Sequence, residues 1–125
     1  MFLNILFVIL GGALGAISRF TIGTQVDKLF NSTFPIGIFF VNLMGCFFIG
    51  LVMSAFQNKI IDNENLKIFL IVGFLGSLTT FSTFALDNFN LFTFKNFLYL
   101  FINLFFTNFF GIVMVFLGIK TIKLI

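Results

Sequence analysis

The charged residues of this chain fall in clusters, and the intervals between the clusters are long. Uncharged stretches cover residues 1–18, 29–58, 68–86 and 96–119 of the 125 residues. A helix needs roughly 17–25 mostly apolar residues to cross the bilayer hydrocarbon core, which is about 30 Å thick. Each stretch meets that length, so the sequence predicts a single all-α domain over residues 1–125 with four transmembrane helices.

The composition excludes most kinds of enzyme. Hydrophobic residues make up 60% and charged residues only 9%, whereas soluble domains are about 25% charged. Histidine is absent and Cys46 is the single cysteine, which excludes His/Cys metal sites and Ser/His/Asp or Cys/His catalysis. The four acidic residues lie near predicted helix ends, and the scattered basic residues form no stripe for nucleic acid. We therefore expect no catalytic residues and no enzyme activity.

Local signals place the helices at about residues 2–23, 34–57, 66–87 and 96–120. The first helix carries small residues at i, i+4 spacing on one face, which favours close contact with a neighbouring helix: Gly11, Gly12, Gly15 and Ala16. A loop over residues 25–28 follows, and Pro35, the single proline, suits the first turn of the second helix.

The basic residues favour neither orientation in the membrane. Four spans put both termini on one side, which carries four Lys/Arg against three on the other: Lys59, Lys67, Lys120 and Lys123 against Arg19, Lys28 and Lys95. Orientation follows a clear Lys/Arg asymmetry, so this near balance predicts that the chain inserts both ways up. Such a population can form an antiparallel, dual-topology homodimer, which is the assembly we expect.

The middle of the third helix is unusually polar. Residues 73–84 read GFLGSLTTFSTF, with two glycines and five hydroxyl side chains where a lipid-facing helix would carry Leu, Ile and Val. This pattern favours a break near residues 76–80 that frees backbone carbonyls to bind Na⁺ or water inside a shielded cavity. The alternative is an unbroken helix, in which the glycines serve helix contact and the hydroxyls bond back to the preceding turn.

Two phenylalanines follow the predicted break. Phe81 and Phe84 lie three residues apart and are interleaved with Ser82 and Thr83. Aromatic rings have electropositive edges, so such rings can line a dry path for a small anion. The alternative is ordinary packing or lipid contact, since the chain has 24 Phe.

Polar residues on the other helices are further candidates for a pathway. Asn42, one turn before Gly45 and Cys46, could supply amide donors to an anion or could form an interhelical hydrogen bond, and the sequence leaves both open. On the fourth helix, Tyr99, Asn103 and Thr107 recur at i+4 and suggest a polar track. Arg19 could extend its charged group to the membrane–water interface, or it could attract anions to the vestibule of a pore.

These residues resemble the Fluc/CrcB fluoride channel family over the full chain. The resemblance is carried by Gly15 and Arg19 in the first helix, by VNLMGCF over residues 41–47, and above all by GFLGSLTTFSTF over residues 73–84. The chain departs from the family pattern in two helices: Asp87 in the third stands where Glu is common, and Asn103 and Thr107 in the fourth stand where Ser is found.

The resemblance implies an antiparallel dimer with two fluoride pores and a structural Na⁺ at the dimer centre. Backbone carbonyls of Gly76 and Thr79 from both subunits would bind the Na⁺. The pore residues it implies are Asn42 as donor, Phe81 and Phe84 as aromatic edges, Tyr99, Asn103 and Thr107 along the exit, and Arg19 as the vestibule charge. Ser82 and Thr83 join them as candidate pore residues.

We therefore expect passive, fluoride-selective export across the bacterial cytoplasmic (inner) membrane, which would reduce fluoride toxicity. Asn, Ser, Thr and Tyr are donors of the kind that can replace the water shell of fluoride. One alternative is a small multidrug exporter of similar length, which needs a buried carboxylate in its first helix that this chain lacks. Another is a structural subunit of a larger membrane complex, in which the polar residues would serve packing.

Overall fold

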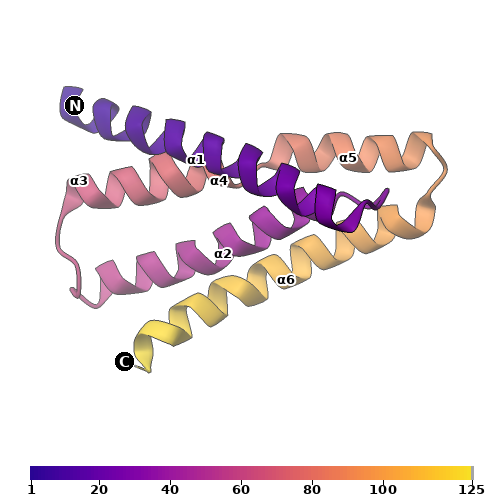
Figure 1. Cartoon of the computed structure of the whole chain (residues 1–125). Coiled ribbons are helices and arrows are strands. Elements are labelled where there is room, and N and C mark those ends of the chain that lie inside the picture. The colour runs from indigo at the N-terminus through magenta and orange to yellow at the C-terminus, as the bar shows by residue number, and fades with distance from the viewer. Residues whose placement is uncertain (125) are drawn as a thin grey trace.

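The computed structural model describes residues 1–124 as an all-helical bundle with four long apolar helical segments (Figure 1). The elements in chain order are α1 (Phe2–Phe30), α2 (Ile36–Gln57), α3 (Glu64–Lys67), the π-helical segment η1 (Ile68–Leu75), α4 (Gly76–Leu78), α5 (Phe81–Thr93) and α6 (Phe97–Lys123). The segment Glu64–Thr93, built from α3, η1, α4 and α5, is the third of four segments long and apolar enough to cross a membrane. The prediction of four spans is thereby confirmed, and the two chain ends lie at the same end of the molecule.

The first helix is longer than its sequence indicated, since it ends at Phe30 and not at Gly23. The segment expected as a loop, residues 25–28, remains helical, and one of its polar side chains bonds to the next helix. The Asp27 carboxylate accepts a 2.7 Å hydrogen bond from the Gly37 backbone N–H near the start of α2. Asn31 then ends the helix in the left-handed region, with φ of 45°. The α1–α2 connection is therefore short, and the Asp27–Gly37 hydrogen bond holds its two ends together.

Glycines bring α1 against the first half of the third span. Gly11 and Gly15 are buried, and a Cβ added at Gly11 would lie 2.8 Å from the backbone nitrogen of Phe74. A Cβ added at Gly15 would meet the Phe74 carbonyl. The predicted small-residue contact face of the first helix is confirmed, and it packs on the η1 backbone (Figure 1).

The helices α2 and α6 pack together in the same way. A Cβ added at Gly118 would lie 2.7 Å from the Leu51 backbone nitrogen, and one at Gly50 would meet the Val115 carbonyl. The helix α6 begins at Phe97 and extends to Lys123, slightly beyond the expected 96–120. These contacts hold α2 centrally, between α1 on one side and α6 on the other (Figure 1).

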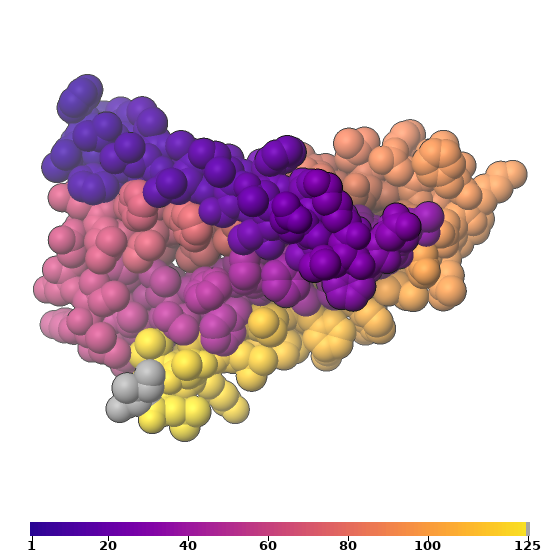
Figure 2. Space-filling view, viewed as in Figure 1, coloured from indigo at the N-terminus to yellow at the C-terminus, as the bar shows by residue number. Residues whose placement is uncertain are grey.

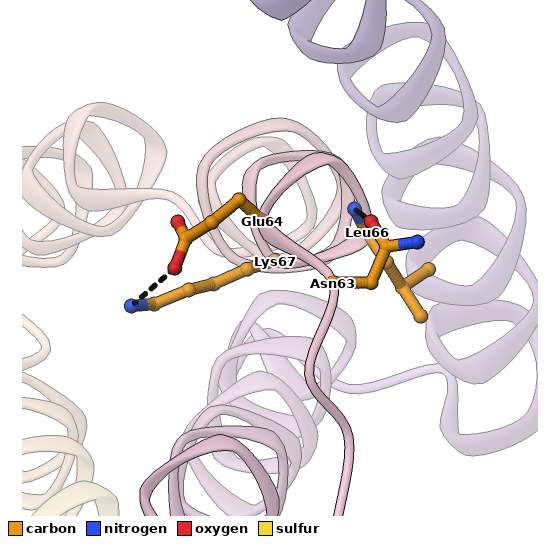
Figure 3. A network of polar contacts seen from close by, with 4 residues as sticks. All are labelled: Asn63, Glu64, Leu66 and Lys67. Atoms are coloured by element: carbon orange, nitrogen blue, oxygen red, sulfur yellow. Dashed lines mark hydrogen bonds and ion pairs between the residues drawn. The ribbon is translucent and has the colours of Figure 1, made fainter. Parts of the chain in front are cut away.

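The third span begins with a capped turn (Figure 3). The Asn63 side chain accepts a 2.9 Å hydrogen bond from the Leu66 N–H, and Glu64 lies 3.9 Å from the Lys67 ammonium. The cap satisfies a free amide of the first turn, whereas such an exposed ion pair contributes about 0–1 kcal/mol. The start of the third span is therefore stabilised mainly by the Asn63 cap.

Most apolar side chains lie on the outside. The buried apolar residues among those described are few, namely Val41, Ala55, Leu75, Leu78, Phe84 and Leu91. Large side chains such as Phe20, Phe101 and Phe116 are more than 60% exposed. Figure 2 shows one face of this surface, with α1 lying across it. A surface of this kind suits lipid as the surrounding solvent.

Candidate functional site

The third span bends where the sequence predicted an interruption. The helix α4 ends at Leu78 and α5 begins at Phe81, and the two residues between them are extended. Thr79 has φ −80° and ψ 155°, and Thr80 has φ −148° and ψ 123°. The π-helical winding of η1 directly before the bend was not predicted, although such segments often mark functional sites.

Asn42 on α2 binds the backbone of Thr80 through both ends of its amide. The Thr80 N–H donates to Asn42 Oδ1 at 2.8 Å, and Asn42 Nδ2 donates to the Thr80 carbonyl at 3.2 Å. Both residues are buried. The bond to Asn42 Oδ1 replaces the helical acceptor that the Thr80 N–H lost at the bend, so Asn42 stabilises the extended backbone. The interhelical hydrogen bond that the sequence left open is therefore present.

The bend removes the usual amide partners of two carbonyls. In a continuous helix, Gly76 would accept from the Thr80 N–H and Thr79 from the Thr83 N–H. The first amide instead donates to Asn42, and the second donates to Thr80 Oγ1 at 3.2 Å, which caps α5. The carbonyls of Gly76 and Thr79 thus lack these i+4 bonds, as a cation site built from carbonyls requires.

The Thr80 hydroxyl is the centre of a small polar cluster at the start of α5. Besides accepting from the Thr83 amide, it donates to Thr83 Oγ1 at 3.2 Å and lies 3.3 Å from Ser82 Oγ. Ser82 is exposed and Thr83 is half-buried. The three hydroxyls therefore gather at one helix N-terminus, where backbone N–H groups favour negative charge.

Arg19 lies inside α1 and not near its end, because the helix continues to Phe30. Its Nη1 lies 3.5 Å from the Thr79 carbonyl, a long contact at the limit of a hydrogen bond. The side chain is half-buried. A fixed positive charge therefore lies beside the bend, at a carbonyl that the sequence analysis assigned to a cation.

A groove of about 400 Å³ opens between α2, the bend and α6. Many of the candidate residues line it, and they come from three different spans: Asn42, Gly76, Thr79, Thr80, Phe81, Phe84 and Thr107. Ser82, Thr83, Tyr99, Asn103 and Arg19 are not among its lining residues. The groove brings together helix segments that are far apart in the sequence.

The two phenylalanines differ in environment. Phe81 is 78% exposed, whereas Phe84 is 7% exposed. Their ring centroids are 5.9 Å apart and the ring planes meet at 44°, so the rings touch in a tilted arrangement. Phe84 is therefore anchored inside the helical bundle, whereas most of the Phe81 ring is uncovered.

The predicted polar track divides along α6. Thr107 Oγ1 donates to Asn103 Oδ1 at 3.0 Å, and Asn103 Nδ2 donates to Asn88 Oδ1 at 3.0 Å. The Tyr99 ring instead packs edge-on against Phe34, with centroids 5.6 Å apart. Asn88 was missed because the third helix was expected to end at about residue 87, whereas α5 continues to Thr93. Its i+4 relation to Phe84, whose carbonyl it binds, could have indicated a helical position.

Asp87 faces a second cavity of about 360 Å³ at the far end of α5, lined also by Thr33, Pro35, Asn90 and Asn96. Its Oδ2 is buried and has no hydrogen-bond partner among residues 1–124. The acidic residue that departs from the family pattern therefore lies in the middle of α5 and outside the groove at the bend.

Comparison with known proteins identifies the family. Residues 6–119 match the profile of a family described as "CrcB-like protein, Camphor Resistance (CrcB)". A "Fluoride-specific ion channel FluC" of Campylobacter fetus is 48% identical over 104 residues, covering 82% of this chain and 80% of the relative. The protein of the same name from Azobacteroides pseudotrichonymphae is 41% identical over 109 residues, covering 83% and 86% respectively. This chain is therefore a multi-pass membrane protein of the CrcB/FluC fluoride ion channel family, which is not an enzyme family.

Proposed function

We propose that this protein is a fluoride-selective channel that lets fluoride leave the cell passively across the bacterial cytoplasmic membrane. The observation that carries the proposal is the groove at the bend, where the Asn42 amide, the Phe81 and Phe84 rings and the Thr107 hydroxyl line one space. The names of the similar proteins supply fluoride as the ion.

The chemistry of the groove suits a small, strongly hydrated anion. A pore must replace the water shell of fluoride with donors while staying too narrow for larger anions. Asn42 Nδ2 carries two protons, and the Thr80 carbonyl takes one of them. The second proton remains for an anion. The ring edges of Phe81 and Phe84 would supply weaker positive contacts at the next position along the path.

The proposed assembly is an antiparallel homodimer. A single subunit leaves Phe81 largely exposed and leaves open the groove that Asn42 and Thr107 line, so in one subunit alone a partly polar groove would open toward lipid. Unpartnered polar groups in lipid are costly, and a second copy covering this face would remove that cost. The near balance of basic residues between the two ends supports insertion in both orientations.

A structural Na⁺ fits the donor set at the bend. The carbonyls of Gly76 and Thr79 lack their i+4 amides, and two antiparallel subunits would contribute four such oxygens. When bound, the ion would supply a fixed positive charge that ties the two bent spans together. A carbonyl oxygen has two lone pairs, so the Arg19 contact at Thr79 leaves one free.

Passive flow is the simplest mechanism for this chain. None of the acidic residues Asp27, Asp62, Glu64 and Asp87 lines the groove, so no carboxylate stands at the bend to exchange protons with it. In acidic surroundings fluoride enters cells as neutral HF and dissociates inside. A channel then returns the anion along its gradient and reduces toxicity.

Flux from liposomes tests the function against its two rivals. We expect the purified protein in potassium fluoride-loaded liposomes to release fluoride, read with a fluoride electrode, once valinomycin lets K⁺ leave as the counter-ion, at a rate independent of an imposed proton gradient. Chloride release under the same conditions should be far slower. Proton exchange driven by a cationic drug would indicate an exporter, and no flux of any kind would indicate a structural subunit.

Orientation can be tested separately. Adding Lys at the exposed positions Gln57 and Ile60 should fix one orientation, and adding Lys at Leu29 and Phe94 should fix the other. Each double variant alone should lose flux, and co-expression of the two should restore it. Full flux from either variant alone would contradict the antiparallel dimer.

A further inference from the structure

A chain of buried hydrogen bonds connects α5 to α6. Thr107 Oγ1 donates to Asn103 Oδ1 at 3.0 Å, Asn103 Nδ2 donates to Asn88 Oδ1 at 3.0 Å, and Asn88 Nδ2 donates to the Phe84 carbonyl at 2.9 Å. Asn103 is 2% exposed and Asn88 is 7% exposed. Both amides are therefore shielded, and every link of the chain is short.

The donor-to-acceptor direction of this series of hydrogen bonds is set at its Phe84 end. The Phe84 carbonyl can only accept, so Asn88 must turn Nδ2 toward it and Oδ1 toward Asn103. Asn103 must then present Nδ2 to Asn88 and Oδ1 to Thr107. The Thr107 hydroxyl is left to donate. A backbone carbonyl on α5 thus decides the orientation of a hydroxyl on α6.

Asn88 also lies at the centre of the packed face of α5. The buried residues of this helix are Phe84, Asn88 and Leu91, which follow one another at helical spacing on a single face. The opposite side exposes Leu86, Phe89 and Phe92. The register of α5 against α6 is therefore fixed where the amide pair lies.

We propose that Asn88 and Asn103 are a positioning pair, which holds Phe84 against α6 and sets the direction of the Thr107 hydroxyl in the groove. This inference rests on the proposed fluoride channel. A fluoride ion at Thr107 must draw the hydroxyl proton away from Asn103 Oδ1. Fluoride is a stronger hydrogen-bond acceptor than chloride, so the pair also favours fluoride over chloride at this step.

Isosteric and apolar variants test the pair in liposomes. Asn88→Asp keeps the side-chain shape and removes the donor to the Phe84 carbonyl. We expect fluoride flux to fall by roughly tenfold or more in a monodisperse protein, because the Phe84 carbonyl loses its side-chain donor and the Asn88–Asn103–Thr107 chain loses the bond that sets its direction. The control is Thr93→Val, which removes a hydroxyl on the same helix that bonds only within that helix, to the Phe89 carbonyl. The control should keep parental flux.

A double variant separates positioning from simple stabilisation. Asn88→Leu alone leaves Asn103 with an unpaired donor and should lower the midpoint of thermal unfolding. Adding Asn103→Leu removes that donor and should restore the midpoint, while flux and fluoride/chloride selectivity stay low. Recovery of flux together with the midpoint would overturn the proposal. If the double variant does not yield monodisperse protein, Asn103→Asp decides, with reduced flux expected and parental flux overturning it.

The two proposals fail differently. A parent protein that carries no fluoride contradicts the proposed function itself. A parent that carries fluoride, together with undiminished flux in Asn88→Asp, contradicts the positioning pair alone.

Discussion

The two halves of the third span are held in the bundle by different means. The half before the bend, η1, lies against α1 through backbone contacts at Gly11, Gly15 and Gly73. The half after the bend, α5, is held by side-chain hydrogen bonds from two other helices: Asn42 on α2 bonds to the Thr80 backbone, and Asn103 on α6 bonds to Asn88. At the backbone contacts, any side chain larger than that of glycine would overlap a neighbouring helix. The side-chain hydrogen bonds, in contrast, can be altered by substitutions that change a single donor or acceptor atom. The first half thus serves as a fixed support, and the second half carries the groups proposed to act on the ion.

The largest effect is expected in the first half. Gly15→Ala places a Cβ against the Phe74 carbonyl, so α1 and η1 must separate. Overpacking of this kind costs about 1–3 kcal/mol, and we expect loss of monodisperse protein in size-exclusion chromatography. The matched control is Gly23→Ala on the same helix, whose Cβ meets its nearest atoms only at 3.9 Å. Equal behaviour of the two variants would show that the backbone contact does not support the first half.

At the bend itself, Asn42→Asp should abolish conduction. The carboxylate can still accept from the Thr80 N–H but loses the donor to the Thr80 carbonyl and any donor for an anion. A charge placed deep in a membrane protein costs about 2.5–3.5 kcal/mol, which corresponds to roughly a hundredfold in rate. Fluoride efflux from liposomes measures this. Conduction near the parental rate would mean that the amide is dispensable for the ion.

In the second half, Phe81→Ile keeps much of the bulk and removes the ring edge. We expect fluoride flux to fall by about two- to tenfold, since aromatic edge contacts are worth about 0.5–1.5 kcal/mol. Dimer formation, measured by cross-linking, should survive. The control is Phe89→Ile, also exposed on α5 but outside the groove. A fall of the same size in both variants would remove the Phe81 ring from the mechanism.

The smallest effect is expected from the cap between the halves. Thr80→Val removes the oxygen that accepts from the Thr83 N–H and should destabilise the protein by about 1 kcal/mol. Thr80→Ser retains that oxygen and serves as the control. Thermal unfolding in detergent measures the stability of both variants. A Val variant as stable as the Ser variant would show that this cap does not hold the start of α5.

The contrast between the two halves of the third span also explains which structural features could be predicted from the sequence. Glycine spacing identified the α1 contact face, and hydroxyl density identified the bend, because both patterns are local. The end of α1 was misplaced because Asp27 looked like a loop residue, while its partner, the Gly37 amide, lies ten residues away. Asn88 was overlooked for the same reason, since its partner Asn103 belongs to another helix.

By itself the sequence determined that four helices cross the membrane, that the third bends near residues 76–80, and to which family the chain belongs. These features follow from the lengths of apolar stretches and from residue types that cannot remain in a regular lipid-facing helix. The tertiary structure decided that Asn42 binds the Thr80 backbone, that Arg19 reaches the Thr79 carbonyl, and that the Phe84 carbonyl directs the Asn88–Asn103 chain. The physical reason is that a polar side chain in a membrane must find a partner, and only the packing of helices determines which one lies within reach.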